Sequence, residues 1–164
     1  MTTERANVSP DGKWVVYRLN PRPWKISING GEPVPLLDKQ ADGATISPDG
    51  KLIACLYKEQ ENMLWKVAII TFDGGRLLKI LDIPVLSGQH TFLRWTADSG
   101  SLVYIDIKDG VSNLWLQTLS AGRPRQLTDF KSESINSFDL SRDGRLAISR
   151  GTTTSDVVLI SDLK

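Results

Sequence analysis

The chain has 164 residues, of which 24% are charged, and a formal net charge of +1. Such a balanced charge gives no basic surface for nucleic acid or an anionic membrane, so we exclude nucleic acid from the expected partners. No stretch reaches the roughly 20 apolar residues that span a bilayer, and residues 1–14 lack the features of a secretory signal. We therefore expect a soluble chain without membrane insertion. Its length suits a single domain over residues 1–164. The abrupt start of the first repeat suggests that the chain is part of a longer protein.

A turn motif of the type Ser-Pro-Asp-Gly-Lys recurs four times along the chain. The copies occupy residues 9–13, 47–51, 96–100 and 141–145, and each follows an apolar residue and precedes a β-prone run. The aspartate can bond its own backbone, and the glycine can adopt positive φ, so the motif predicts a turn between strands. The motif returns roughly every 40 to 50 residues, which is typical of a four-stranded propeller blade.

The segments between these turns predict four repeats of about four antiparallel strands. In the third repeat the predicted strands are 91–95, 102–106, 113–118 and 125–128. In each first strand the residues three and five positions before the aspartate are apolar, which places one apolar face toward a neighbouring repeat. No window shows sustained helical periodicity beside helix start and stop signals. The prediction is an all-β propeller with blades at approximately 1–40, 41–86, 87–131 and 132–164.

Three tryptophans recur after the turn aspartates, and we place them in the third strands. Trp24, Trp65 and Trp115 could form a stacking platform for sugars or bases. A packing role is the favoured interpretation, because one strand position repeated in three blades is what a recurring core contact requires. Cys55 lies in an apolar run and has no second cysteine to pair with, so a small buried side chain is expected.

The repeats resemble those of the TolB-like, or WD-repeat-like, β-propeller family, whose hallmark is an apolar strand entering Ser-Pro-Asp-Gly-Lys. The phrases at 125–130 and 141–151 are also similar to the closing blades of propellers attached to bacterial serine/threonine kinases and winged-helix regulators. The family carries no catalytic residues on its repeats, so the resemblance implies none here. It does imply a bacterial parent protein, and a TolB-type parent would be periplasmic, although the residues themselves leave the compartment open.

The fourth repeat provides three predicted strands, at 135–140, 146–150 and 156–161, and no outer strand. Propellers of this family usually have six or more blades, so four blades with one strand missing leave unpaired edges and exposed blade faces. Natural β proteins normally cover such edges. We therefore expect a homo-oligomer, most simply a twofold dimer that joins two arcs into one ring.

Catalytic, metal and cofactor sites are not predicted. His90 is the only histidine, no Gly-x-Ser-x-Gly nucleophile motif is present, and a single distant cysteine makes neither a zinc site nor an evident Cys-His pair. The turn aspartates could be imagined as cation ligands, but no copy has the clustered carboxylates that calcium prefers, so turns are the better interpretation. The Gly-Gly pairs at 30–31 and 74–75 are likewise expected to be hairpin turns rather than phosphate-binding loops.

Polar residues alternate with the apolar face on the predicted first strands: Asn7, Thr45, Arg94 and Asp139. Arg94 and Asp139 come from adjacent blades, and an ion pair or hydrogen-bond ladder along the channel is the favoured interpretation. A second hypothesis is a polar pocket at the channel mouth for a peptide or small ligand, lined by His90, Arg94, Asn136 and Asp139.

The expected function is a non-catalytic β-propeller module that binds a protein, a peptide or a small ligand. We expect it to be the C-terminal sensory or scaffold part of a larger bacterial protein. Two alternatives remain open. The chain could be the gating propeller of a prolyl-oligopeptidase-like serine peptidase, or a TolB-like periplasmic scaffold.

Overall fold

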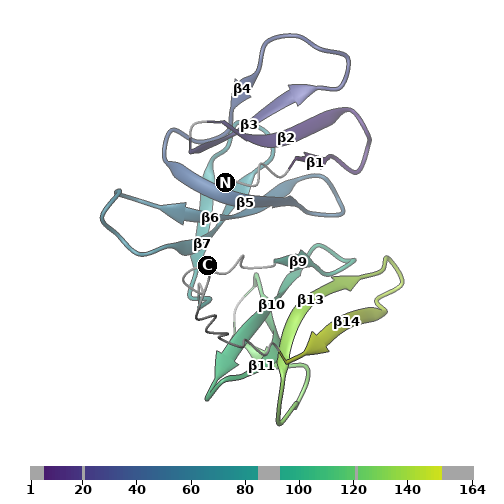
Figure 1. Ribbon diagram of the computed structural model, residues 1–164. Helices are drawn as coiled ribbons and strands as arrows, with labels where there is room; N and C mark the ends of the chain where they lie inside the picture. Colours follow the sequence, from purple (N-terminus) through teal and green to yellow (C-terminus); the bar gives the residue numbers. More distant parts are fainter. Residues whose placement is uncertain (1–5, 20, 85–92, 121, 153–164) are drawn as a thin grey trace, which may run out of the picture.

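The computed structural model describes residues 6–19, 21–84, 93–120 and 122–152. Within these ranges the chain forms only β-strands and the turns that join them, and the strands make four antiparallel sheets. In Figure 1 the first sheet is at the top, the second is below it, and the third and fourth lie side by side at the bottom. The all-β fold class predicted from the sequence is confirmed. No helix in the described part of the chain has the length and apolar character needed to cross a membrane.

Each sheet follows chain order from its first strand to its last, as in the blades of a propeller. Blade 1 contains β1 (Asn7–Val8), β2 (Trp14–Leu19), β3 (Arg22–Ser27) and β4 (Val34–Pro35). Blade 2 contains β5 (Gln40–Ile46), β6 (Leu52–Lys58), β7 (Lys66–Thr71) and β8 (Leu77–Leu81). Blade 3 contains β9 (Arg94–Trp95), β10 (Ser101–Lys108), β11 (Val111–Thr118) and β12 (Arg125–Gln126). Blade 4 contains β13 (Ser134–Leu140) and β14 (Leu146–Gly151), and its predicted third strand at 156–161 lies outside the described residues.

The repeated motif forms the turn between the first two strands of every blade. In blade 1 the Ser9 hydroxyl donates to Asp11 Oδ1 at 2.5 Å and accepts from the amide of Trp14 at 2.9 Å. The glycine position adopts positive φ in all four copies, at Gly12, Gly50, Ser99 and Gly144. The serine at 99 adopts a φ of 60°, and its hydroxyl accepts from the amide of Asp49 at 3.0 Å. This bond links the first turns of blades 2 and 3.

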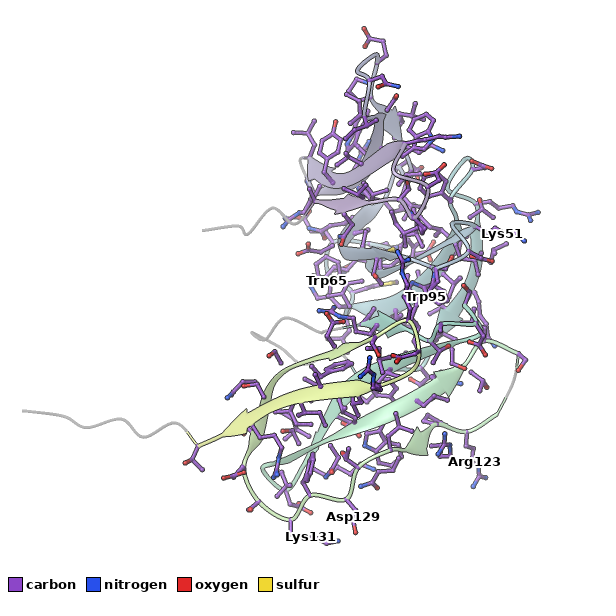
Figure 2. All side chains as sticks on the ribbon, turned by 90° about the vertical axis from the view of Figure 1, so that its right-hand side faces the viewer. Lys51, Trp65, Trp95, Arg123, Asp129 and Lys131 are labelled. Carbon is purple, nitrogen blue, oxygen red and sulfur yellow. The ribbon has the colours of Figure 1, made fainter. Side chains whose placement is uncertain are left out.

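Apolar cores lie between successive blades. The core between blades 2 and 3 includes Ala54, Val67, Ile69, Leu81, Leu93, Trp95, Leu102 and Tyr104. Similar clusters join blade 1 to blade 2 around Val16 and Ile53, and blade 3 to blade 4 around Leu114 and Phe138. Figure 2 shows Trp95 at the junction between the upper and lower blades. Face-to-face packing of the sheets, rather than any single sheet, therefore holds the fold together.

Blade 1 also has apolar residues on its outer side, the side away from blade 2, and no described blade covers them. Val16 faces blade 2, so strand alternation points Val15 and Tyr17 the other way. Val8 pairs with Val15 and is 59% exposed. The expectation that every first strand buries its apolar face is therefore wrong for blade 1, because burial requires a neighbouring blade.

The recurring tryptophans are less buried than expected. Trp24, Trp65 and Trp115 are all half-buried, and Trp65 lies just before β7 rather than within it. The indole of Trp24 donates to the Leu19 carbonyl at 3.2 Å, and Trp115 packs at the margin of the core between blades 2 and 3. The tryptophan of the central core is instead Trp95, in a first strand. Cys55 is fully buried as predicted, and burial raises the pKa of its thiol to about 12.

Candidate functional site

The first strands of the four blades lie next to one another in the order β1, β5, β9, β13. Side chains connect each strand to the next one. Asn7 Nδ2 donates to the carbonyl of Ala44 at 2.7 Å, and Trp95 Nε1 donates to the carbonyl of Thr45 at 3.1 Å. These bonds satisfy carbonyl groups of β5 and fix the spacing of the inner strands.

Arg94 and Asp139 form the link between the first strands of blades 3 and 4. Arg94 Nε lies 2.9 Å from Asp139 Oδ1, and the guanidinium stands 5.9 Å from the centre of the Phe138 ring. The same carboxylate oxygen also accepts from the amide of Leu140. The two side chains are 33% and 74% exposed, so water screens the pair and its contribution to stability is small. An ion pair predicted from the alternation of the strands is thus present, with both charges accessible from solvent.

Of the other two predicted site residues, the structure describes Asn136 but not His90. Asn136 is exposed and occupies a β-bulge, because Ile135 and Ser137 pair with consecutive residues of β14 and leave Asn136 without a cross-strand partner. Bulges of this kind redirect a side chain away from the regular alternation. No contact joins Asn136 to Arg94 or Asp139 among the described interactions. His90 lies outside the described residues.

The turn aspartates use their carboxylates within their own turns. Hydrogen bonds from the Ser9 hydroxyl and the Lys13 amide lower the pKa of Asp11, and bonds from Thr96 and Gly100 do the same for Asp98. Burial raises the pKa of Asp49, but the bonds from Ser47 and from the backbone outweigh it. Within the described ranges, no group of three or more His, Cys, Asp or Glu residues is placed to hold a metal ion.

A cleft between blades 1 and 2 is a feature that the motif analysis did not identify. It has a volume of about 460 Å³ and is lined by Ser9, Pro10, Asp11, Trp14, Asp49, Gly50, Phe72 and Asp73. Beside it the buried Lys25 donates to the Phe72 carbonyl at 2.9 Å, and its ammonium lies 4.9 Å from the Trp14 ring centre and 4.5 Å from that of Phe72. Strand pairing of Lys25 with Val16 puts it on the face toward blade 2, a position that alternation could have revealed.

Comparison with known proteins places this arrangement among propellers. No family model matches the chain. TolB from Acinetobacter baumannii superposes with a TM-score of 0.70 at 21% identity over 92% of this chain, and a TolB protein from Agrobacterium tumefaciens gives 0.66 at 22% identity over 90%. The fold is that of a TolB-like partial β-propeller. The chain spans 38% and 57% of the lengths of those two proteins.

Peptidases appear in the same comparisons. A solved prolyl endopeptidase superposes with a TM-score of 0.63 at 18% identity, covering 90% of this chain and 26% of that one. By sequence, dipeptidyl-peptidase 5 from Porphyromonas gingivalis is 28% identical over 104 residues, which are 62% of this chain and 15% of that protein. These similarities give no support to the narrower resemblance to propellers of kinases and winged-helix regulators.

Proposed function

We propose that this chain is a non-catalytic binding module in which rigid β-propeller blades present a recognition site along the inner strands. The observation that carries the proposal is the Arg94–Asp139 pair, which offers a cation and an anion from adjacent blades on a surface open to solvent. The contacts that Asn7 and Trp95 make between inner strands instead join an uncharged side chain to a backbone carbonyl. The larger protein would be a bacterial sensory, regulatory or scaffold protein.

The favoured ligand is a short peptide segment, because such a segment carries both a carboxylate for Arg94 and an ammonium or amide group for Asp139. Binding replaces the ion pair with two separate charge-assisted hydrogen bonds, which are stronger than bonds between neutral groups. The proposed role therefore needs the two residues to act together, and the blades to hold them at a fixed spacing.

A peptide titration of the isotope-labelled chain followed by nuclear magnetic resonance tests this role. The probe is a set of unblocked tripeptides with and without proline, and the expected shifts fall on residues of β9 and β13. The double variant Arg94→Ala/Asp139→Ala should lose the binding while retaining its circular dichroism spectrum. The matched control is Arg18→Ala/Asp42→Ala, which removes an ion pair of 3.3 Å between blades 1 and 2 and should bind normally. Unchanged binding in the first variant would reject the site.

A second candidate is the propeller domain of a prolyl-oligopeptidase-like serine peptidase, which would select or gate substrates for a hydrolase domain. The specific observation in its favour is the 28% identity to dipeptidyl-peptidase 5. The complete gene separates these candidates, because a hydrolase domain in the same reading frame supports the peptidase. A secretory signal without a hydrolase domain supports a periplasmic scaffold of the TolB type instead.

We also propose that the chain, as given, associates with itself through the apolar outer face of blade 1. Contiguous exposed apolar surface, here at Val8 and the half-buried Val15 and Tyr17 beside it, is typical of interaction surfaces. Light scattering at micromolar concentrations is expected to give a mass above the 18.2 kDa of one chain. A mass that stays at this value at every concentration would exclude the dimer.

A further inference from the structure

The outer strands of the blades differ in how well their free edges are protected. β4 and β12 contain two residues each; β4 includes Pro35, which has no amide hydrogen, and β12 follows Pro124 and contains Arg125. Short strands, proline and charge are the usual means by which natural proteins prevent pairing at a sheet edge. The outer strand of blade 2, β8 (Leu77–Leu81), is longer and contains no proline, and a bulge at Leu78 is the one irregularity in its pairing with β7. It contains five residues, with the sequence Leu-Leu-Lys-Ile-Leu.

β8 is the last strand of its sheet, and no described strand pairs with its far side. Leu81 is buried in the core between blades 2 and 3, whereas Leu78 is 45% exposed and Ile80 is 39% exposed. Cross-strand pairing puts Ile80 on the side of Ala68 and Lys79 on the opposite side with Ile69, while Leu78 occupies a bulge between the residues that pair with Ile69 and Ile70. An approaching strand would therefore find unpaired backbone groups together with aliphatic side chains.

Lys79 determines which strand can pair there. It is the central residue of β8, and its ammonium donates to the Leu119 carbonyl of blade 3 at 2.9 Å. A second copy of β8, paired antiparallel and in register, would place Lys79 directly opposite its equivalent. Like charges in that position are destabilising, whereas an acidic residue in the same position is stabilising.

We propose that the free edge of β8 accepts an extended peptide segment of a partner protein, in which aliphatic residues flank one central acidic residue. Main-chain hydrogen bonds to β8 provide the affinity, and contacts with Leu78, Ile80 and Lys79 provide the specificity. This site lies on the outer strand of blade 2, so it is independent of the proposed recognition site on the inner strands of blades 3 and 4.

The probe for this proposal is a short peptide with blocked ends and the sequence Thr-Val-Ile-Glu-Val-Leu-Thr. Calorimetry with the full chain should show binding at concentrations below about 1 mM, and replacement of the central glutamate by lysine should weaken it roughly threefold to tenfold. Methylation of alternate amides of the peptide should remove the binding. Hydrogen exchange of the complex should show new protection on those alternate amides of residues 77–81 that do not already bond β7.

A charge-swapped variant makes the test reciprocal. Lys79→Glu should reverse the preference, so that the lysine peptide binds more tightly than the glutamate peptide. The matched control is Arg125→Glu on β12, which changes the same charge on another outer strand and should leave the preference unchanged. Both residues are on outer strands with exposed side chains, so the variants are expected to fold.

Several results would overturn the proposal. These are the absence of binding to the folded chain up to about 1 mM, protection at β9 and β13 instead of β8, and a preference that Lys79→Glu does not alter. Loss of binding in Arg94→Ala/Asp139→Ala would likewise assign the peptide to the inner strands. That outcome would favour the first site while rejecting the edge, so failure of either proposal can be recognised separately.

Discussion

Blades 1 and 3 carry the same pair of aromatic residues at equivalent positions, but in different surroundings. Tyr17 pairs with Trp24 across β2 and β3, and Tyr104 pairs with Trp115 across β10 and β11. Tyr104 is 2% exposed because blade 2 covers it, whereas Tyr17 is half-buried and faces away from blade 2. The comparison shows that the repeat determines strand pairing within a blade, and that the neighbouring blade determines burial.

The largest expected effect concerns two glycines at equivalent turns of blades 2 and 1. A Cβ atom on Gly75 would lie 1.4 Å from the carbonyl oxygen of Leu36, while nothing lies within 4 Å of the same atom on Gly31. Both have positive φ, 63° at Gly75 and 112° at Gly31, so both substitutions strain the backbone, and only Gly75→Ala adds a clash with blade 1. Gly75→Ala should therefore destabilise the chain by about 4 kcal/mol or more, and Gly31→Ala by about 1 to 3 kcal/mol, in urea denaturation. Equal losses would mean that blades 1 and 2 do not approach closely at Leu36.

The two tyrosines test the comparison directly. Tyr104→Ala removes a ring from the core between blades 2 and 3 and should cost about 3 kcal/mol of unfolding free energy. Tyr17→Ala removes the equivalent ring from an uncovered face and should cost about 1 kcal/mol or less. Urea denaturation of dilute samples measures both. Similar losses in the two variants would show that the outer face of blade 1 is covered even in the dilute chain.

The proposed self-association would bury the outer face of blade 1 at higher protein concentration, and so would reduce the difference in burial between blades 1 and 3. Ile28 is 54% exposed in the turn that directly follows β3 of blade 1. If a second copy covers this face, Val8→Ser/Ile28→Ser should reduce the average mass in light scattering toward that of one chain. The control is Leu64→Ser, which changes the most exposed large apolar residue of the described part and lies in the loop before β7. An equal decrease in average mass for the control would show that the association is nonspecific and does not use the outer face of blade 1.

The fold could be predicted because its signals are local. The hydrogen bonds of each turn connect residues within a few positions of one another, as from Ser47 to Asp49, so the motif contains its own structural cause. Contacts between blades are less predictable. Whether Val8 is covered, or where Trp65 lies relative to β7, depends on residues of other repeats or on loop length. Figure 2 shows Trp65 and Lys51 on opposite sides of the molecule, at the two ends of blade 2.

In the candidate site, too, the positions fixed by regular strand alternation could be predicted, and those that depend on a bulge or on packing between blades could not. Arg94 and Asp139 could be matched because alternation fixes which face each residue occupies, and the register between blades brings them within 2.9 Å. Asn136 follows no such rule, since a bulge interrupts the alternation at its position. The buried ammonium of Lys25 and the cleft beside it require two blades to be packed together. The ligand roles of Arg94, Asn136, Asp139 and His90 stay predictions.

The smallest expected effect is acid sensitivity, which should not distinguish blade 1 from blade 3. Hydrogen bonds within the turns lower the pKa of Asp11 and of Asp98 below its ordinary value in the folded chain. Because the unfolded chain then binds these protons more tightly, the stabilisation is present above about pH 4 and is lost as the pH falls through the folded pKa. The urea midpoint should therefore decrease between pH 5 and pH 3. Asp11→Asn and Asp98→Asn should each reduce the slope of urea midpoint against pH, and by equal amounts. A slope reduced by Asp98→Asn alone would show that even the turns depend on the neighbouring blade.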